Sequence, residues 1–220
     1  MSNAWSYSSL SLFQQCPKKY YHLKVKKDIV EKQTHALIYG NEVHKVAEEF
    51  VKEDKPIPEK YEDICKPVYR VKDMKGEKHC ELRLGMTKEL KPCKFFDDDV
   101  WWRGVIDLLI VNGDKGKIID YKTGKNSKYA DIKQLDLFTV AAFTHFPDLT
   151  EIKAGLLFLV TNDFITKSYN KGDVIGIMSN FYKEVDIMDT CFKEDVWNAK
   201  PNFTCYKYCP VVHCPHNGKR

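Results

Sequence analysis

The sequence predicts an α/β protein, with a central mixed β-sheet flanked by helices, in a single domain that covers residues 1–220. Three observations lead to this class. Apolar runs rich in β-branched and aromatic residues, typical of buried strands, occupy 100–111 and 153–160. Apolar residues recur at helical spacing over 36–53 and 127–145. Helical and strand patterns in this order favour a sheet covered by helices.

Near the N-terminus the chain reads WSYSSLSLFQQCPKKYY. We expect Ser8 or Ser9 to cap a short helix and Pro17, after Cys16, to end it. Lysines and aromatic residues are interleaved over 18–27. That mixture suits a nucleic-acid backbone and its bases, and it is equally typical of a solvated helix face.

An amphipathic helix is predicted over 36–53. Its apolar face consists of Leu37, Gly40, Val43, His44, Ala47, Phe50 and Val51. A lone histidine on such a face is more often a hydrogen-bonded core residue than a ligand. The charged, proline-containing stretch 54–73 is interpreted as a linker followed by a short helix.

A strand is predicted over 79–86, where Glu81 is interpreted as an exposed strand acid. Three consecutive acids, 97–99, resemble a metal-binding box, but we interpret them as an acidic turn that precedes the next strand. Beyond the central hairpin, 164–169 is predicted to add an edge strand. A further helix is expected within 174–197, from about Ser179 onward.

The predicted hairpin at 100–122 contains the candidate catalytic residues. Its turn residues lie at 112–116, and Asp120 and Lys122 share one face of the second strand because side chains alternate. Pairing of the two strands would bring Asp107 near Asp120. A carboxylate inside an apolar strand is unfavourable unless it is paired or bound to a cation. Two such acids beside a lysine suit Mg²⁺ or Mn²⁺ and phosphodiester hydrolysis, whereas the alternative is a structural Asp–Lys pair.

Composition indicates a soluble globular protein, with 43% hydrophobic and 30% charged residues and a net charge of +4. We find no apolar run long enough to cross a bilayer and no signal peptide, so we expect a cytoplasmic protein without a membrane partner. Eight cysteines without an export signal argue against a disulfide framework. The three cysteines clustered at 205–214 indicate metal binding.

Three motifs resemble the PD-(D/E)xK nuclease superfamily, and in particular its RecB-like branch. They are G-x-x-x-H at 40–44, G-x-x-D at 104–107 and D-Y-K-T-G at 120–124. The resemblance implies a restriction-endonuclease-like core. It is strongest to phage exonucleases and to CRISPR-associated nucleases of similar size, which implies a prokaryotic or viral protein.

The resemblance also implies a site. His44, Asp107 and Asp120, with the Tyr121 carbonyl, would bind Mg²⁺ or Mn²⁺, and Lys122 would orient water and offset negative charge on the phosphate. Imidazole among the ligands favours Mn²⁺.

Two further residues have assignments that depend on the resemblance. Gln134 corresponds to the glutamine of the family's Q-x-x-x-Y motif, which helps to position DNA; here Phe138 replaces the tyrosine. A surface glutamine is the alternative. Related nucleases often carry an acid on the strand before G-x-x-D, so Glu81 is an alternative extra site residue.

Both ends of the chain resemble RecB-like nucleases that hold a four-iron four-sulfur cluster. The implied ligands are Cys16, Cys205, Cys209 and Cys214. The cluster-binding elements would be 5–27 and 201–220. The last three cysteines are separated by three and four residues, where the family typically has two and five. Tetrahedral Zn²⁺ is the alternative, with His213 and His216 as substitute ligands.

The joint order of these motifs predicts a metal-dependent deoxyribonuclease, and specifically an exonuclease acting on single-stranded DNA or duplex ends, whose cluster orders the DNA-binding region. Self-association and partner proteins of recombination or CRISPR adaptation are further expectations. Two alternatives remain. One is a nucleic-acid-binding accessory protein that does not cut, and the other is a zinc-ribbon-like interaction module.

Overall fold

The computed structural model describes residues 4–125 and 127–219. The chain forms two compact units. We call Thr34–Met178 the sheet unit, and Met1–Gln33 together with Ser179–Arg220 the terminal unit. The prediction that residues 1–220 act as one nuclease domain is not tested by this division and stays a prediction.

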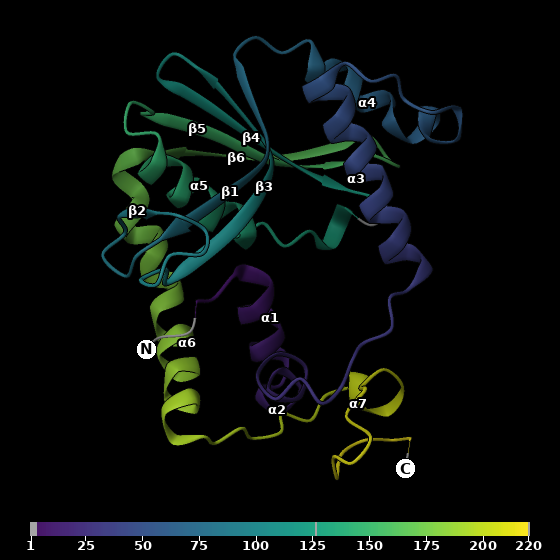
Figure 1. The fold of residues 1–220 in the computed structure, drawn as a ribbon, viewed down its shortest axis with the longest axis vertical. Coiled ribbons are helices and arrows are strands. Elements are labelled where there is room, and N and C mark those ends of the chain that lie inside the picture. The colour runs from purple at the N-terminus through teal and green to yellow at the C-terminus, as the bar shows by residue number, and fades with distance from the viewer. Residues whose placement is uncertain (1–3, 126, 220) are drawn as a thin grey trace. The chain divides into compact units, whose positions relative to one another are not determined.

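The sheet unit is built on a six-stranded sheet in the order β2-β1-β3-β4-β5-β6 (Figure 1). Only β4 and β5 are parallel, so the sheet is mixed. The strands are β1 (Glu77–Met86), β2 (Pro92–Cys93), β3 (Trp102–Asn112), β4 (Lys115–Lys122), β5 (Glu151–Phe158) and β6 (Asp163–Asn170). The predicted α/β class with a mixed sheet is confirmed, and so is the edge strand, because β6 pairs only with β5.

Helices α3 (His35–Glu53) and α4 (Glu62–Lys72) share one hydrophobic core with the sheet. From α3 this core contains Val43, Ala47, Phe50 and Val51, and from the strands Leu108, Ile110, Ile119, Tyr121 and Leu157. Leu37, placed on the same apolar face by the sequence pattern, is 52% exposed, because the buried stripe of α3 begins only at Val43.

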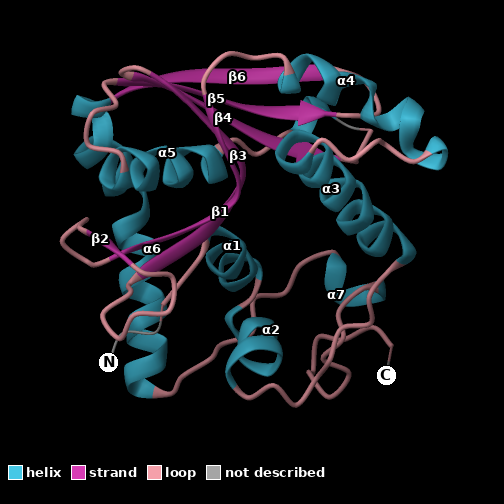
Figure 2. Cartoon of the chain, turned by 45° about the horizontal axis from the view of Figure 1, so that its top comes forward, coloured by secondary structure: helices cyan, strands magenta, loops and turns pink. Residues whose placement is uncertain are grey.

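Helix α5 (Lys133–His145) packs along the sheet (Figure 2) and contacts β1 to β5. The sequence pattern predicted this helix from residue 127, but Ser127–Tyr129 form a separate short 3-10 turn. All nine residues from Leu135 to Phe143 are buried, so α5 is buried on all sides rather than along one face, and the charged Asp136 among them is hydrogen-bonded by Lys167 and Tyr169.

The β3–β4 hairpin places the predicted site. Asn112 pairs with Lys115, so Gly113 and Asp114 form a two-residue turn, and Gly113 has the positive φ of 62° that such a turn favours. The backbone ladder runs from this turn to Leu108 opposite Ile119 and ends there. The next residues in register, Asp107 and Asp120, therefore lie where the two strands stop pairing.

The terminal unit consists of short helices and loops. It contains α1 (Tyr7–Gln15), α2 (Pro17–Tyr20), a π-helical turn (Tyr21–Val25), the residues of α6 (Val174–Glu194) from Ser179 onward, and α7 (Thr204–Lys207). Ser6, rather than Ser8 or Ser9, caps α1: its Oγ accepts from the Ser9 N–H, and the Ser9 Oγ accepts from the Ser6 N–H at 2.9 Å. Helix α1 ends before Pro17, as predicted.

Aromatic rings form much of the core of the terminal unit. Edge-to-face and tilted contacts join Phe13, Tyr20, Phe192 and Trp197, and Tyr21 stacks on Trp197 with ring centroids 5.3 Å apart. Such pairs add stabilisation beyond the area they bury. The aromatic half of the N-terminal basic stretch is thus used largely for packing.

Within the described ranges, we find no helix whose length and apolar character would let it cross a membrane.

Candidate active site

Three side chains from three elements of the sheet unit converge at the end of the β3–β4 ladder. His44 from α3, Glu81 from β1 and Asp107 from β3 each offer one ligand atom, and these atoms all lie within 4.8 Å of one another. Two carboxylates and an imidazole form a donor set typical of a divalent cation such as Mn²⁺.

Asp107 is fixed by its neighbours on two elements. Its Oδ2 accepts the Tyr121 N–H at 2.7 Å, so the side chain takes over as acceptor where the β3–β4 ladder ends. The same oxygen lies 3.3 Å from His44 Nδ1. The His44 ring is held edge-to-face against Tyr121, with centroids 6.0 Å apart. Helix α3 and strand β4 therefore orient one ligand pair together.

Glu81 has an unusual backbone. Its φ is +47°, a left-handed conformation that non-glycine residues seldom adopt. In the β1–β3 register it lies opposite Asp107, between the pairs Cys80–Leu108 and Leu82–Ile106. Backbone strain of this kind costs roughly 1–3 kcal/mol and is concentrated at functional sites. Here it occurs at the position that brings a second carboxylate to Asp107.

Asp120 and Lys122 lie next to this group on β4. Lys122 Nζ is 2.6 Å from Asp120 Oδ2, and it donates a hydrogen bond to Gln134 Oε1 on α5 at 3.3 Å. Asp120 is only 3% exposed, and its Oδ2 accepts no well-directed hydrogen bond despite the nearby ammonium group. Gln134 is thus in contact with the site lysine.

The carboxylates repel one another and are partly removed from water. Burial, followed by the charge of Asp107, raises the pKa of Asp120 to about 6, although Lys122 opposes the shift. Burial and the charges of Asp107 and Glu48 also raise the pKa of Glu81. An excess of crowded negative charge is what a bound cation would relieve.

The same surroundings favour the charged form of His44. Burial disfavours the imidazolium, but the hydrogen bond and charge of Asp107, with the charge of Asp120, outweigh burial and raise the pKa of His44. A proton on His44 therefore substitutes for part of the positive charge that the acids require. Metal binding to the imidazole would have to displace that proton.

The donor set fits a divalent cation on two observations from the sheet unit. The buried Asp120 Oδ2 lacks a well-directed donor, and burial followed by the charge of Asp107 raises the pKa values of Asp120 and Glu81. His44, Glu81 and Asp107 would hold the ion together with the adjacent Asp120.

The structure can be compared with the residues expected from the sequence. His44 and Asp107 come together, Asp120 and Lys122 lie beside them, and Gln134 contacts Lys122. The role of the Tyr121 carbonyl stays a prediction, since the contact recorded for its backbone at the site is through its N–H.

Glu81 was interpreted as an exposed strand acid, with a role as an extra site acid as the alternative that the family resemblance offered. Its carboxylate lies beside His44 and Asp107, because the register of β1 against β3 sets Glu81 opposite Asp107 across a long connection. Phe138, at the family's tyrosine position, packs against Trp102. In the acidic stretch, Asp97 and Asp99 lie within 4.8 Å of Cys93, and Asp97 Oδ2 accepts the Lys94 N–H, as in a turn.

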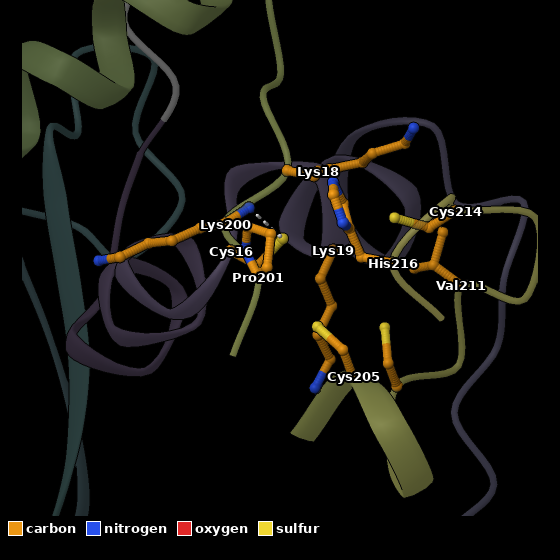
Figure 3. Close-up of a pocket in the computed structure, with 11 residues that line it drawn as sticks. Cys16, Lys18, Lys19, Lys200, Pro201, Cys205, Val211, Cys214 and His216 are labelled. Atoms are coloured by element: carbon orange, nitrogen blue, oxygen red, sulfur yellow. Dashed lines mark hydrogen bonds between the residues drawn. The ribbon is translucent and has the colours of Figure 1, made fainter. Parts of the chain in front are cut away.

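Four of the five cysteines of the terminal unit line one pocket, and Cys191 does not (Figure 3). The four are Cys16, Cys205, Cys209 and Cys214, all present as free thiols. Lys18, Lys19 and Lys200 also line the pocket, but the Lys19 ammonium is paired with Glu31 at 3.5 Å and the Lys200 ammonium donates to the Gln14 carbonyl at 2.9 Å. His216 is a further lining residue.

Backbone groups already point at two of the sulfur atoms. The Lys200 N–H donates to Cys16 Sγ at 3.4 Å (Figure 3), and the Asn202 N–H donates to Cys205 Sγ at 3.5 Å. His213 is engaged elsewhere, because its Nε2 lies 3.1 Å from His22 Nε2 and His22 Nδ1 contacts Asp28.

An imidazole, three carboxylates and a lysine beside one another at the end of a strand ladder suit metal-dependent phosphodiester hydrolysis. Residues 4–214 match the family model of the PD-(D/E)XK nuclease superfamily, and the chain belongs to that superfamily. Its members are generally metal-dependent nucleases, so the substrate class is nucleic acid.

No curated protein matches the chain. A solved structure, described as the crystal structure of SSO0001, is 15% identical and has a TM-score of 0.49. The similarity covers 99% of this chain and 88% of that one.

Proposed function

We propose that the protein is a Mg²⁺- or Mn²⁺-dependent deoxyribonuclease, and specifically an exonuclease of the RecB-like branch. The convergence of His44, Glu81 and Asp107 within 4.8 Å is the observation that carries the proposal. A divalent cation at this position supplies activation of water and neutralisation of charge that develops on the phosphate.

The residues of the chain have distinct roles in this proposal. His44, Glu81, Asp107 and Asp120 hold the cation, and the Tyr121 carbonyl adds a ligand. Lys122 contacts the phosphate or the attacking water, and its ammonium donates to the charge that grows during cleavage. Gln134 is a positioning residue, because its Oε1 accepts from Lys122 and limits where the ammonium can lie.

End-labelled single-stranded and duplex DNA, incubated with Mg²⁺, Mn²⁺ or chelator, tests the proposal. We expect shortening from one end in the presence of either cation, and no cleavage in chelator or by Asp120→Ala. Cleavage by that variant at the wild-type rate would refute the assignment. DNA binding without cleavage by the wild type under any cation would instead indicate an accessory protein, and internal nicking of circular DNA would indicate an endonuclease.

We further propose that the terminal unit holds a four-iron four-sulfur cluster on Cys16, Cys205, Cys209 and Cys214. The shared pocket and the N–H···S contacts support it, since hydrogen bonds to the sulfur atoms are among the protein features that tune such clusters. Tetrahedral Zn²⁺ on the same four cysteines, with Zn–S distances of about 2.3 Å, is the alternative.

Anaerobic purification tests the cluster. We expect visible absorbance together with iron and acid-labile sulfide in equal amounts. One zinc ion per protein without iron would refute the cluster and support the tetrahedral zinc site instead. In this proposal residues 1–220 act as one nuclease domain, with cluster-binding elements 5–27 and 201–220.

The cellular setting is proposed from the family resemblance. The enzyme would act in the cytoplasm of a prokaryotic or virus-infected cell, on DNA ends, with recombination or CRISPR proteins or further copies of itself as partners. Sedimentation of the purified protein, with and without DNA, tests self-association.

A further inference from the structure

The last 25 residues, 196–220, have an unusual charge. They contain Lys200, Lys207, Lys219 and Arg220 and no acid. The whole chain has 35 basic and 31 acidic residues, so this tail alone accounts for the net charge of +4, and the rest is balanced at 31 of each. Concentrated positive charge of this kind favours a polyanion as partner.

Three large rings of the tail face solvent. Phe203 is 86% exposed, Tyr206 68% and Tyr208 72%. Within the described part of the chain, neither Phe203 nor Tyr208 has an aromatic or cation–π partner. Exposure of three rings within six residues is unfavourable for a surface that binds nothing. The N-terminal rings of the same unit are different, because Tyr20 is buried and Tyr21 stacks on Trp197.

Hydrogen bonds inside the terminal unit fix the backbone that carries these rings. The buried Asn217 side chain donates to the carbonyls of Cys209 and Val211, both at 3.0 Å. The Gly218 N–H donates to the Cys205 carbonyl at 3.1 Å. A Cβ at Gly218 would lie 2.6 Å from the Tyr206 ring, so glycine is required there. Rings on a fixed backbone lose little conformational entropy when a ligand binds.

We propose that Phe203, Tyr206 and Tyr208, with Lys207 and Lys219, form a binding surface for single-stranded nucleic acid; we call it the tail surface. The inference rests on the proposed nuclease function, since it identifies single strands as the substrate class. Aromatic rings accept unpaired bases by stacking, whereas the bases of a duplex are already stacked on one another. The lysines contact the phosphates between the stacked bases.

Fluorescence anisotropy of the full-length protein, in chelator so that no DNA is cut, provides the test. The probes are a labelled oligothymidylate of about 20 nucleotides, longer than the typical site of one stacking module, and a duplex of the same length. Replacing Phe203, Tyr206 and Tyr208 together by leucine keeps apolar area but removes the rings. We expect single-strand affinity to fall roughly 100-fold or more and duplex affinity to change little.

Two matched variants separate stacking from other causes. Tyr206→Phe with Tyr208→Phe keeps the rings and is expected to bind the single strand like the wild type. Lys207→Ala with Lys219→Ala is expected to reduce the salt dependence of binding by about 1.4 in log–log slope, since each phosphate contact contributes about 0.7. Phe203→Leu alone is a milder variant, to be used if the triple variant does not fold. The unfolding temperature and the cluster absorbance of each variant show whether it is folded.

The outcomes are distinguishable. Wild-type-like binding of the single strand by the leucine variant, or equal wild-type affinity for the two probes, would overturn the tail surface. A protein ligand held by apolar contact would tolerate leucine and also counts against it. Turnover of thymidine 5′-p-nitrophenyl phosphate with Mn²⁺ reports on the sheet unit separately. Its absence in the wild type would refute the nuclease function while leaving single-strand binding intact.

Discussion

Replacing Asp120 by asparagine should make the metal-free protein more stable at neutral pH. The carboxyl group is 3% exposed, and burial together with the Asp107 charge raises its pKa to about 6, from 3.8 for a solvated aspartate. This rise in pKa corresponds to a free-energy cost of roughly 3 kcal/mol for the ionised carboxylate in the folded state, at about 1.36 kcal/mol per pKa unit. Asparagine has the shape of the neutral acid and avoids this penalty, so we expect a gain of about 1–3 kcal/mol at pH 7.5.

The sign follows from proton binding. Below the unfolded pKa, Asp120 is protonated in both states and contributes no difference between the proteins. Between pH 3.8 and about 6 the folded state binds more protons than the unfolded state, so wild-type stability falls as pH rises through this window. The advantage of Asp120→Asn should therefore be absent at pH 3.5 and complete above pH 7.

Urea unfolding in chelator at both pH values measures the effect, with the exposed Asp148→Asn as the matched control. A variant less stable than the wild type at pH 7.5, or an equal gain at both pH values, would refute the reasoning. Mn²⁺ should stabilise the wild type and reduce the difference, because it binds only the folded site. The variant should have no nuclease activity.

Four further predictions concern single residues. Lys122→Met should lower kcat by roughly 10²- to 10³-fold with little change in Mn²⁺ affinity; an unchanged kcat would remove the lysine from the mechanism. Gln134→Ala should lower kcat by about tenfold and change its pH profile, whereas an unchanged profile would mean that the contact with Lys122 is structural. Apparent Mn²⁺ affinity should rise as pH increases through the raised pKa of His44, because the imidazole must lose its proton, and titration calorimetry on His44→Gln should find a shallower rise. Cys209→Ser should lose the visible absorbance of the cluster; full iron content in that variant would exclude Cys209 as a ligand.

The sequence predicted the hairpin well because local chemistry determines it. A two-residue turn at Gly113 and Asp114 fixes the β3–β4 register, and that register alone sets Asp107 opposite Asp120. The amphipathic pattern similarly predicted α3 and so the element that carries His44. These features depend on residues close in the chain.

Features that depend on distant contacts could not be predicted in the same way. Glu81 joins the ligand group only through the β1–β3 register and its own left-handed backbone, and neither leaves a periodic signal. Gln134 meets Lys122 because α5 packs on the sheet, and the sequence pattern placed the start of that helix too early. The division into two units follows from contacts between the two ends of the chain, which composition does not report.

One oxygen atom of Asp107 has both a structural role and a role in the candidate metal site. Its Oδ2 accepts the Tyr121 amide hydrogen and also faces His44. Alanine at this position would remove the acceptor that anchors two diverging strands as well as the charge, so loss of activity would be ambiguous. Asparagine at position 107 keeps an oxygen that can accept the Tyr121 N–H and removes only the negative charge. It is therefore the informative replacement wherever a side-chain oxygen takes the place of a backbone acceptor at the end of a strand pair.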